Sequence, residues 1–318
     1  MSGIALVARE QMLSRMNDPM PRREFLRLSL GAAGALGGLA MLQAADATAP
    51  ASQASLAKPA RLIIRGDDMG CAHSVNLALI KAYTQGIQKT IEVIVAGPWF
   101  PEAARLLAEH PGVDVGIHLA ITSEWDNVKW RPLSHCPSLV DEDGYFWPMV
   151  YPNPNYAGRA IMDNPWKDAD VEREFRAQIE LGLRKIPRIS HVSGHMGCTR
   201  LSPEITALTD RLSKEYGIDL DLADHGVKSL GYSGPKKNLP QKTESFIKAI
   251  DQLVAGETYC FVDHPGLDDP ELRAISHIGY EDVAADRQGV TDLWTSAQIK
   301  TEIERRGIQL ICYRDLKA

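Results

Sequence analysis

The chain has 318 residues, of which 44% are hydrophobic and 24% are charged, and its formal net charge is −6. This length and apolar content are sufficient for the core of one large domain or two small ones. The charge balance lacks the basic excess that nucleic-acid binding uses, so we expect no nucleic-acid partner. The sequence contains no internal repeat of the kind that would indicate a solenoid.

The N-terminal segment 1–47 resembles a bacterial twin-arginine export signal. Its arginine pair, Arg22 and Arg23, precedes an apolar run over residues 28–41 that is rich in Gly and Ala. The alternative is a membrane anchor, but the run is shorter than the roughly 20 residues that a spanning helix needs. A small-x-small site predicts cleavage after Ala47. We therefore expect a periplasmic or extracellular protein with no stable membrane anchor after cleavage.

Five cysteines are scattered along the rest of the chain, at Cys71, Cys136, Cys198, Cys260 and Cys312. No two of them form a C-x-x-C pair, so a zinc knuckle is not expected. An exported protein meets an oxidising compartment, where one or two disulfides can form. The odd number leaves at least one thiol free or paired between chains, and the sequence leaves the pairing open.

A flexible linker, residues 48–60, leads into a predicted single domain, residues 61–318, in which strands and helices alternate. Strands are predicted from continuous or alternating apolar residues and helices from apolar spacings of three and four. In chain order the predicted elements are strand 61–66, helix 74–87, strand 90–97, helix 101–111, strand 113–122, an inserted loop at about 123–165, helix 168–186, strand 188–195, helix 202–217, strand 218–225, helix 242–256, strand 257–266, helix 295–307 and strand 308–315. Roughly seven alternating units predict an α/β domain with parallel strands, a β/α barrel that is regular or distorted.

Polar residues lie at or near the ends of four of the predicted strands. They are Asp67 and Asp68, His118, His195 and His264. Taken singly, each has an ordinary structural explanation, such as a hydrogen-bonded histidine or a helix cap. The carboxyl ends of barrel strands gather the active site, however, so these residues would form a metal and acid/base set if their strand ends converge.

The spacing of two histidines decides which of them is the better metal ligand. His191 and His195 are four residues apart in a stretch that alternates like a strand. On a strand they share a face but lie about 13 Å apart, at roughly 3.3 Å per residue, so they cannot hold one ion together. On a helix they could share one. We expect His195, which follows the flexible Gly194, to be the ligand, and His191 to have a supporting or structural role.

Five motifs follow one another along the predicted domain. The first is Asp-Asp-Met-Gly followed by Asn, the next are "GIHLAIT", "HVSGH" and "DHPG", and the last is the C-terminal pair "RQGVTDLWTS" and "GIQLICYRDL". In this order they resemble the motifs of the YdjC/ChbG-type carbohydrate deacetylases, in which the first is Asp-Asp-Phe-Gly followed by Asn. The resemblance covers residues 61–316, nearly all of the predicted domain. It implies a distorted β/α barrel of the polysaccharide-deacetylase/YdjC type.

The resemblance also assigns roles to the residues at the strand ends. It implies one divalent ion held by Asp68, His118 and His195, with Asp67 as general base and His264 as acid or oxyanion stabiliser. A metal-activated water would then remove an acetyl group from an N-acetylated sugar or oligosaccharide. Imidazole ligands favour Zn²⁺ slightly, while the carboxylate and the family resemblance allow Mg²⁺. A homodimer is compatible with the family.

The chain departs from the family pattern at a few positions. Ser193 stands where the family usually has Asp, which removes a carboxylate expected just outside the metal ligands. Met69 replaces Phe, Arg65 and Gly66 replace Asn and Ala, and Val290 falls where Glu is common. These changes bear on the tuning of the site and on its substrate more than on the metal ligands.

The inserted loop is dense in aromatic residues. Trp125, Trp130 and Arg131 are candidate substrate-binding residues, because aromatic rings stack on the apolar faces of sugars. The alternative is that the rings pack the loop onto the barrel or form a dimer contact. The sequence leaves both open.

Two classes of function follow from these observations. The first is an exported metal-dependent enzyme that deacetylates a carbohydrate. The second is an exported carbohydrate-binding protein that keeps the barrel without turnover. A third hypothesis, also enzymatic, is hydrolysis of a different bond, such as an ester or phosphoester. The presence of all five expected site residues favours the deacetylase.

Overall fold

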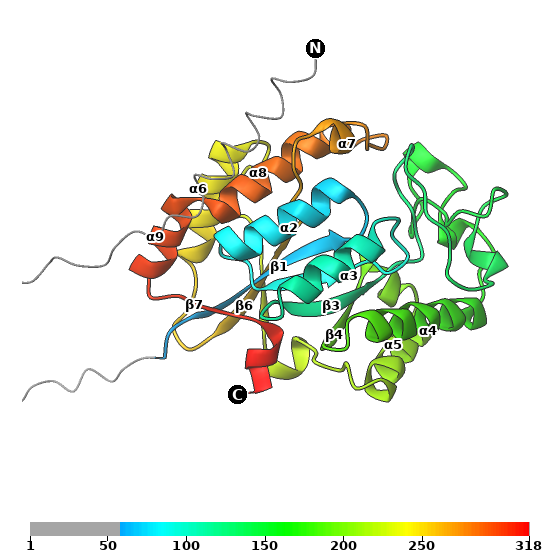
Figure 1. Ribbon diagram of the computed structural model, residues 1–318, viewed down its shortest axis with the longest axis horizontal. Coiled ribbons are helices and arrows are strands. Elements are labelled where there is room, and N and C mark those ends of the chain that lie inside the picture. Colours follow the sequence, from blue (N-terminus) through cyan, green and yellow to red (C-terminus); the bar gives the residue numbers. More distant parts are fainter. Residues whose placement is uncertain (1–57, 318) are drawn as a thin grey trace, which may run out of the picture. The chain divides into compact units, whose positions relative to one another are not determined.

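Seven parallel strands form one sheet in residues 58–317, the part of the chain that this computed structural model describes (Figure 1). The expected export signal, 1–47, and most of the expected linker, 48–60, lie outside the described residues and stay predictions. Within the described part, no helix combines the length and the apolar character needed to cross a membrane.

The strand order makes an incomplete barrel. The strands are β1 (Arg61–Met69), β2 (Thr90–Val93), β3 (Asp114–Leu119), β4 (His191–Gly194), β5 (Lys228–Leu230), β6 (Thr258–Asp263) and β7 (Gln309–Ile311). Their order is β4-β3-β2-β1-β6-β5, and β7 also pairs with β1. Among the described residues no pairing joins β4 to β5, so the sheet stays open there. The predicted α/β fold, a distorted β/α barrel in one domain, is confirmed.

The central strand β1 has an apolar run near its start and two aspartates near its end. Leu62, Ile63 and Ile64 are fully buried, as expected for a parallel strand that is covered on both faces. The first residues of β1 pair with β7 and its later residues with β2, while β6 follows its other side. The carboxyl end of β1 therefore emerges between β2 and β6, where polar side chains of neighbouring strands can meet it.

Helices surround the sheet. They are α2 (His73–Gln85), α3 (Phe100–Glu109), α4 (Asp168–Lys185), α5 (Pro203–Glu215), α6 (Leu239–Ile250), α7 (Pro270–Arg273), α8 (Val283–Thr295) and α9 (Ala297–Arg305). Helices α5 and α6 each start with a side-chain cap: Ser202 accepts a hydrogen bond from the backbone N–H of Ile205 at the start of α5, and Asn238 accepts one from that of Gln241 at the start of α6. Short 3₁₀ segments are η2 (Pro137–Leu139), η3 (Pro154–Tyr156), η4 (Ile161–Asp163), η5 (His195–Arg200), η6 (Ala223–His225) and η7 (Tyr313–Lys317).

The predicted strand at 218–225 is wrong. The segment holds the 3₁₀ turn η6, and β5 forms a few residues later instead. The carboxylate of Asp221 accepts a hydrogen bond from the backbone N–H of Ala223, and Gly226 adopts a left-handed conformation with φ of 64°. Aspartate and glycine thus turn the chain before it can pair, which the alternation of apolar residues did not reveal.

Helix α8 was missing from the predicted elements. Gly289 in its middle weakens the local helix signal, since glycine is a poor helix former. The structure forms the helix because Val290, Leu293 and Trp294 are fully buried against α2 and α6. Tertiary packing therefore overrides local propensity here, and it places Arg287 on a rigid element.

All five cysteines lie in the described residues, and none of them is bonded to another. Cys71, Cys136, Cys198 and Cys260 are buried, and burial raises the pKa of each thiol. The thiols thus act as small apolar core groups. The structure pairs none of the disulfides that an oxidising compartment would permit.

Candidate metal site

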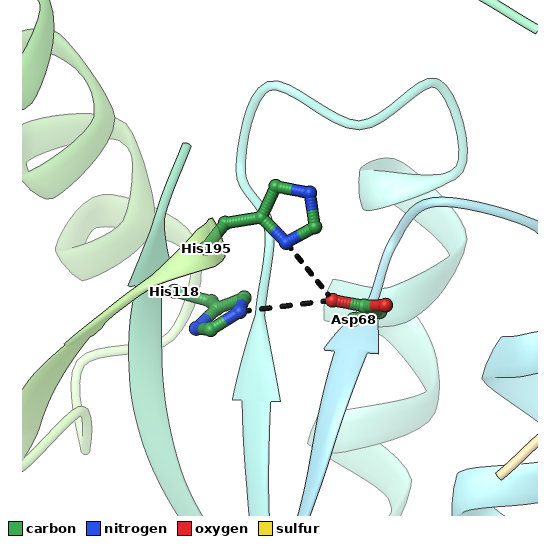
Figure 2. A group of neighbouring side chains, drawn as sticks. All are labelled: Asp68, His118 and His195. Carbon is green, nitrogen blue, oxygen red and sulfur yellow. Dashed lines mark ion pairs between the residues drawn. The ribbon is translucent and has the colours of Figure 1, made fainter. Parts of the chain in front are cut away.

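Three predicted ligands meet at the carboxyl ends of β1, β3 and β4 (Figure 2). One ligand atom from each of Asp68, His118 and His195 lies within 4.8 Å of the others. Oδ1 of Asp68 is 3.6 Å from Nε2 of His118 and 3.3 Å from Nδ1 of His195. Ligands about 2.1 Å from a tetrahedral ion lie roughly 3.4 Å apart, so the separations to Asp68 match those of a divalent cation site.

The backbone of Asp68 explains how two adjacent carboxylates face one region. Successive side chains on a regular strand point to opposite faces. Asp68 instead has φ of 75°, a left-handed conformation, and the pairing of β1 with β2 shifts register between Gly66 and Met69. Oδ2 of Asp67 consequently lies 3.8 Å from Nε2 of His118, close to the contact that Asp68 makes. Such a conformation costs on the order of 1–3 kcal/mol and is retained mostly at functional sites.

The two oxygens of Asp68 have different surroundings. Oδ2 accepts a hydrogen bond of 2.7 Å from Nη2 of Arg287. Oδ1 has no hydrogen-bond partner among the described residues, although Asp68 is only 1% exposed. Burial favours the neutral acid, but the Arg287 guanidinium holds the pKa of Asp68 well below its usual range. The nearest ring nitrogen, Nδ1 of His195 at 3.3 Å, makes no hydrogen bond of good geometry with this buried oxygen, and a cation at this point would satisfy it.

His195 is held by a second carboxylate. Its Nε2 lies 2.9 Å from Oε2 of Glu124, which leaves Nδ1 directed at Asp68. Burial disfavours the charged ring, but the carboxylates of Glu124 and Asp68 outweigh burial and raise the pKa of His195 to about 10. Glu124 was not among the predicted site residues. The available signal was an acidic residue soon after β3, next to the aromatic loop.

His118 presents its other nitrogen to the site. Its Nδ1 lies 2.7 Å from the hydroxyl of Ser193, and its Nε2 faces Asp67 and Asp68. Burial lowers the pKa of His118, although the nearby Asp67 carboxylate acts to raise it. The neutral ring therefore has an available lone pair, which a metal ligand requires.

Arg65 orients the predicted general base. Its Nε and Nη2 each donate a hydrogen bond of 2.8 Å to the carboxylate of Asp67, and its Nη1 donates one of 3.1 Å to the hydroxyl of Tyr313. This bidentate contact fixes the plane of the Asp67 carboxylate beside His118. Arg65, noted in the sequence only as a departure from the family, thus belongs to the site.

His264 follows β6, and its side chain is 41% exposed. Its backbone N–H donates to Asp263, and its Nδ1 lies 3.6 Å from the same carboxylate. Burial lowers its pKa, but the negative charge of Asp68 and the contact with Asp263 raise it above the usual value. A raised pKa and a partly exposed ring suit a proton donor, and the acid role stays a prediction.

The three candidate substrate-binding residues do not form an exposed surface on which a sugar could stack. Trp125 and Trp130 are 2% and 3% exposed, so neither presents a free face. The Trp125 ring lies over the Arg287 guanidinium at 5.3 Å. The Arg131 side chain is exposed but donates to the backbone carbonyl of Asp143. The packing alternative describes the two indole rings, and substrate contact by these three residues stays a prediction.

His191 stays outside the ligand group, as expected from its spacing. Its ring stacks on Tyr313 with centroids 3.5 Å apart, and its Nε2 lies 2.5 Å from Oε1 of Glu92. Glu92 is fully buried within β2 and was also missed, although a charged residue inside a buried strand is itself a signal.

The chain is similar to known proteins along most of its length. Residues 61–305 match the family model described as YdjC-like protein. A carbohydrate deacetylase of Enterococcus faecalis is 27% identical, over 80% of this chain and 98% of that protein. A carbohydrate deacetylase of Geobacillus stearothermophilus is also 27% identical, over 81% and 98%.

A solved structure shares the fold. It is that of a candidate cellobiose-phosphate cleavage protein from Enterococcus faecalis, with a TM-score of 0.66 and 24% sequence identity. The similarity covers 81% of this chain and 99% of that one. Since the family model spans the barrel from β1 to α9, the chain belongs to the YdjC-like protein family.

Proposed function

We propose that this protein is an exported, metal-dependent carbohydrate deacetylase that removes the acetyl group from an N-acetylated sugar or oligosaccharide. The observation that carries the proposal is the meeting of Asp68, His118 and His195 beside the oriented carboxylate of Asp67. The names of the family relatives, carbohydrate deacetylases of similar length, support the reaction.

The residues of the site divide the work. A divalent cation held by Asp68, His118 and His195 would supply Lewis-acid activation of water and of the acetyl carbonyl. Asp67, held by Arg65, accepts the proton of the attacking water. His264, with its raised pKa, donates a proton to the departing amine. Two imidazole nitrogens and one carboxylate favour Zn²⁺ and also accept Mg²⁺.

Acetate release from N-acetylated chito-oligosaccharides, measured together with metal content, tests the proposal. We expect release by the purified mature protein, loss with a chelator and recovery with Zn²⁺ or Mg²⁺. Asp67→Asn should keep the metal and lower the rate by at least about 10²-fold, the usual contribution of a general base. Asp268→Asn, at a surface ion pair with Arg273, is the matched control and should leave the rate unchanged.

Each other outcome selects a different hypothesis. If the metal-loaded protein binds acetylated sugars but releases acetate from none of them, it is a carbohydrate-binding protein without turnover. Release from esters or phosphoesters alone would indicate hydrolysis of another bond. Release that Asp67→Asn leaves unchanged would remove Asp67 as the base.

Export by the twin-arginine route is part of the proposal and rests on the sequence of residues 1–47. Replacing Arg22 and Arg23 together with lysine should retain the protein in the cytoplasm, as followed by cell fractionation. Export of this variant through the general secretory route alone would contradict the proposed route. A homodimer stays a prediction, which light scattering of the mature protein would check.

A further inference from the structure

Position 193, where the family pattern usually has Asp, pairs with His118 across β3 and β4 and holds a serine here, and a carboxylate reaches this serine from β2. We propose that Glu92 and Ser193 together position His118 for metal binding. They form a relay of two hydrogen bonds, which runs from the Glu92 carboxylate through the Ser193 hydroxyl to Nδ1 of His118. The inference rests on the metal site of the proposed function.

The strand register makes this contact possible. Glu92 of β2 pairs with Gly116 of β3, and Gly116 pairs in turn with His191 of β4. The Glu92 side chain thus passes over a residue without a side chain. A Cβ atom at position 116 would collide with the Glu92 carboxylate and with Nε2 of His191. The glycine two residues before His118 therefore opens the path along which Glu92 reaches β4.

The donors and acceptors along the relay then assign the proton of His118. Ser193 pairs with His118 across β3 and β4, and its hydroxyl donates to Oε2 of Glu92. A hydroxyl has one proton to donate, so its contact with Nδ1 of His118, at 2.7 Å, uses a lone pair as acceptor. Nδ1 of His118 therefore carries its proton, and Nε2 offers its lone pair toward Asp67 and Asp68.

The Glu92 carboxylate is suited to this acceptor role. Burial favours its neutral form, but His191 outweighs burial and holds the pKa of Glu92 at about 2. Oε1 contacts His191, leaving Oε2 for Ser193. The stack of His191 on Tyr313 keeps this end of the relay rigid. A histidine that ligates a metal commonly has such a carboxylate behind it, either directly or through another group, which sets its tautomer and basicity.

The relay predicts a loss of metal affinity when either member is removed. Ser193→Ala and Glu92→Gln should each weaken Zn²⁺ binding by about 10- to 100-fold, measured by competition with a chromophoric chelator. Ser193→Thr retains the hydroxyl and is the matched control, with affinity close to that of the wild type. Ser193→Ala is a small change, so it also tests the relay if Glu92→Gln does not fold.

Moving the carboxylate separates positioning from a merely structural role. The double variant E92Q/S193D removes the carboxylate from position 92 and places one at 193, where a cavity of about 610 Å³ leaves room. It should recover most of the Zn²⁺ affinity that Glu92→Gln loses. In the Co²⁺-substituted protein, the visible absorption bands should shift in Ser193→Ala and return toward the wild type in E92Q/S193D.

The failures of the two proposals can be told apart. A wild-type protein that binds no Zn²⁺ would overturn the metal site and the relay with it. Zn²⁺ binding by the wild type that is unchanged in both Ser193→Ala and Glu92→Gln would overturn the relay alone. Failure of E92Q/S193D to regain affinity over Glu92→Gln would likewise show that Glu92 acts only as a structural partner of His191.

Discussion

The two histidines of the site are backed by groups of different charge. The ring of His118 is backed by the neutral hydroxyl of Ser193, and burial lowers its pKa. The ring of His195 is backed directly by the carboxylate of Glu124 and faces Asp68, and its pKa is raised to about 10 despite burial. One carboxylate oxygen, Oδ1 of Asp68, thus faces Nε2 of a neutral ring and Nδ1 of a charged one.

This difference determines which proton a cation at the proposed site would displace. His118 is ready to ligate at neutral pH, whereas His195 carries a proton on the nitrogen that faces Asp68. A cation at the proposed site would therefore compete with one proton rather than two. Without a cation, the positive charge of His195 offsets the negative charges of Asp68 and Glu124. Burying these two carboxylates together without such a charge would cost several kcal/mol.

The largest expected effect comes from removing the carboxylate that both histidines share. Asp68→Asn should abolish measurable Zn²⁺ binding and leave the guanidinium of Arg287 buried without its partner. Breaking a buried ion pair from one side costs about 3–5 kcal/mol of unfolding free energy, measured by urea denaturation. Retained affinity in this variant would mean that the two histidines bind a cation elsewhere.

A smaller effect should follow from replacing the charged group directly behind His195 with a neutral one, as the hydroxyl of Ser193 is behind His118. Glu124→Gln keeps the side-chain shape and removes the charge behind Nε2 of His195. We expect Zn²⁺ affinity to fall by about 10- to 100-fold, as for loss of an outer partner of a ligand histidine. The exposed Glu142→Gln, in the same loop, is the control. Equal Zn²⁺ affinities in Glu124→Gln and the wild type would remove the asymmetry as a functional feature.

The pH dependence of binding tests the proton on His195 directly. Below about pH 10 this proton opposes the cation, so Zn²⁺ affinity should rise about tenfold per pH unit between pH 6 and 8, with one proton released per ion. Titration calorimetry in buffers of different ionisation enthalpy measures that number. A release near two would mean that His118 is also protonated, in contradiction to its lowered pKa.

The same shift has a consequence for stability without metal. The folded-state pKa of His195 is raised above its unfolded value of about 6.5, so its contribution to stability is fully present below pH 6.5. That contribution is lost as pH rises toward about 10. In chelator, the stability difference between the wild type and Glu124→Gln should therefore shrink from pH 6 to pH 10. A constant difference would indicate that Glu124 acts through packing.

The meeting of the three candidate ligands could be predicted from the sequence because each lies at the end of an apolar strand. Asp68, His118 and His195 end or follow β1, β3 and β4, and parallel strands gather their carboxyl ends at one edge. The alternation of strands and helices was enough for the barrel as well. The local sequence pattern failed to predict α8, where tertiary contacts decide that a helix forms. It also predicted a strand before β5, where side chains turn the chain instead.

The supporting groups could not be predicted in the same way. Glu124 lies 71 residues before His195, and Arg287 lies 219 residues after Asp68, so their contacts depend on the paths of a loop and a helix. Glu92 stood out only as a charge within an apolar strand. Its role depends on the pairing of Gly116 with both neighbouring strands, which requires the register of the sheet.

The smallest expected effect concerns the loop on the His195 side and the substrate that it can reach. The Tyr151 ring is 46% exposed and lies near Gly197, two residues after His195, whereas Trp130 is buried near the His195 ring. If the loop stacks on a sugar, the exposed ring is the available one.

Tyr151→Ala should therefore raise KM by roughly 2- to 10-fold at unchanged kcat, the size of an aromatic contact. Trp130→Phe keeps an apolar ring in the buried position and should leave KM unchanged, because its indole N–H has no hydrogen-bond partner among the described residues. A KM that rises in Trp130→Phe but not in Tyr151→Ala would instead assign the sugar contact to Trp130, and would mean that the loop opens when substrate binds.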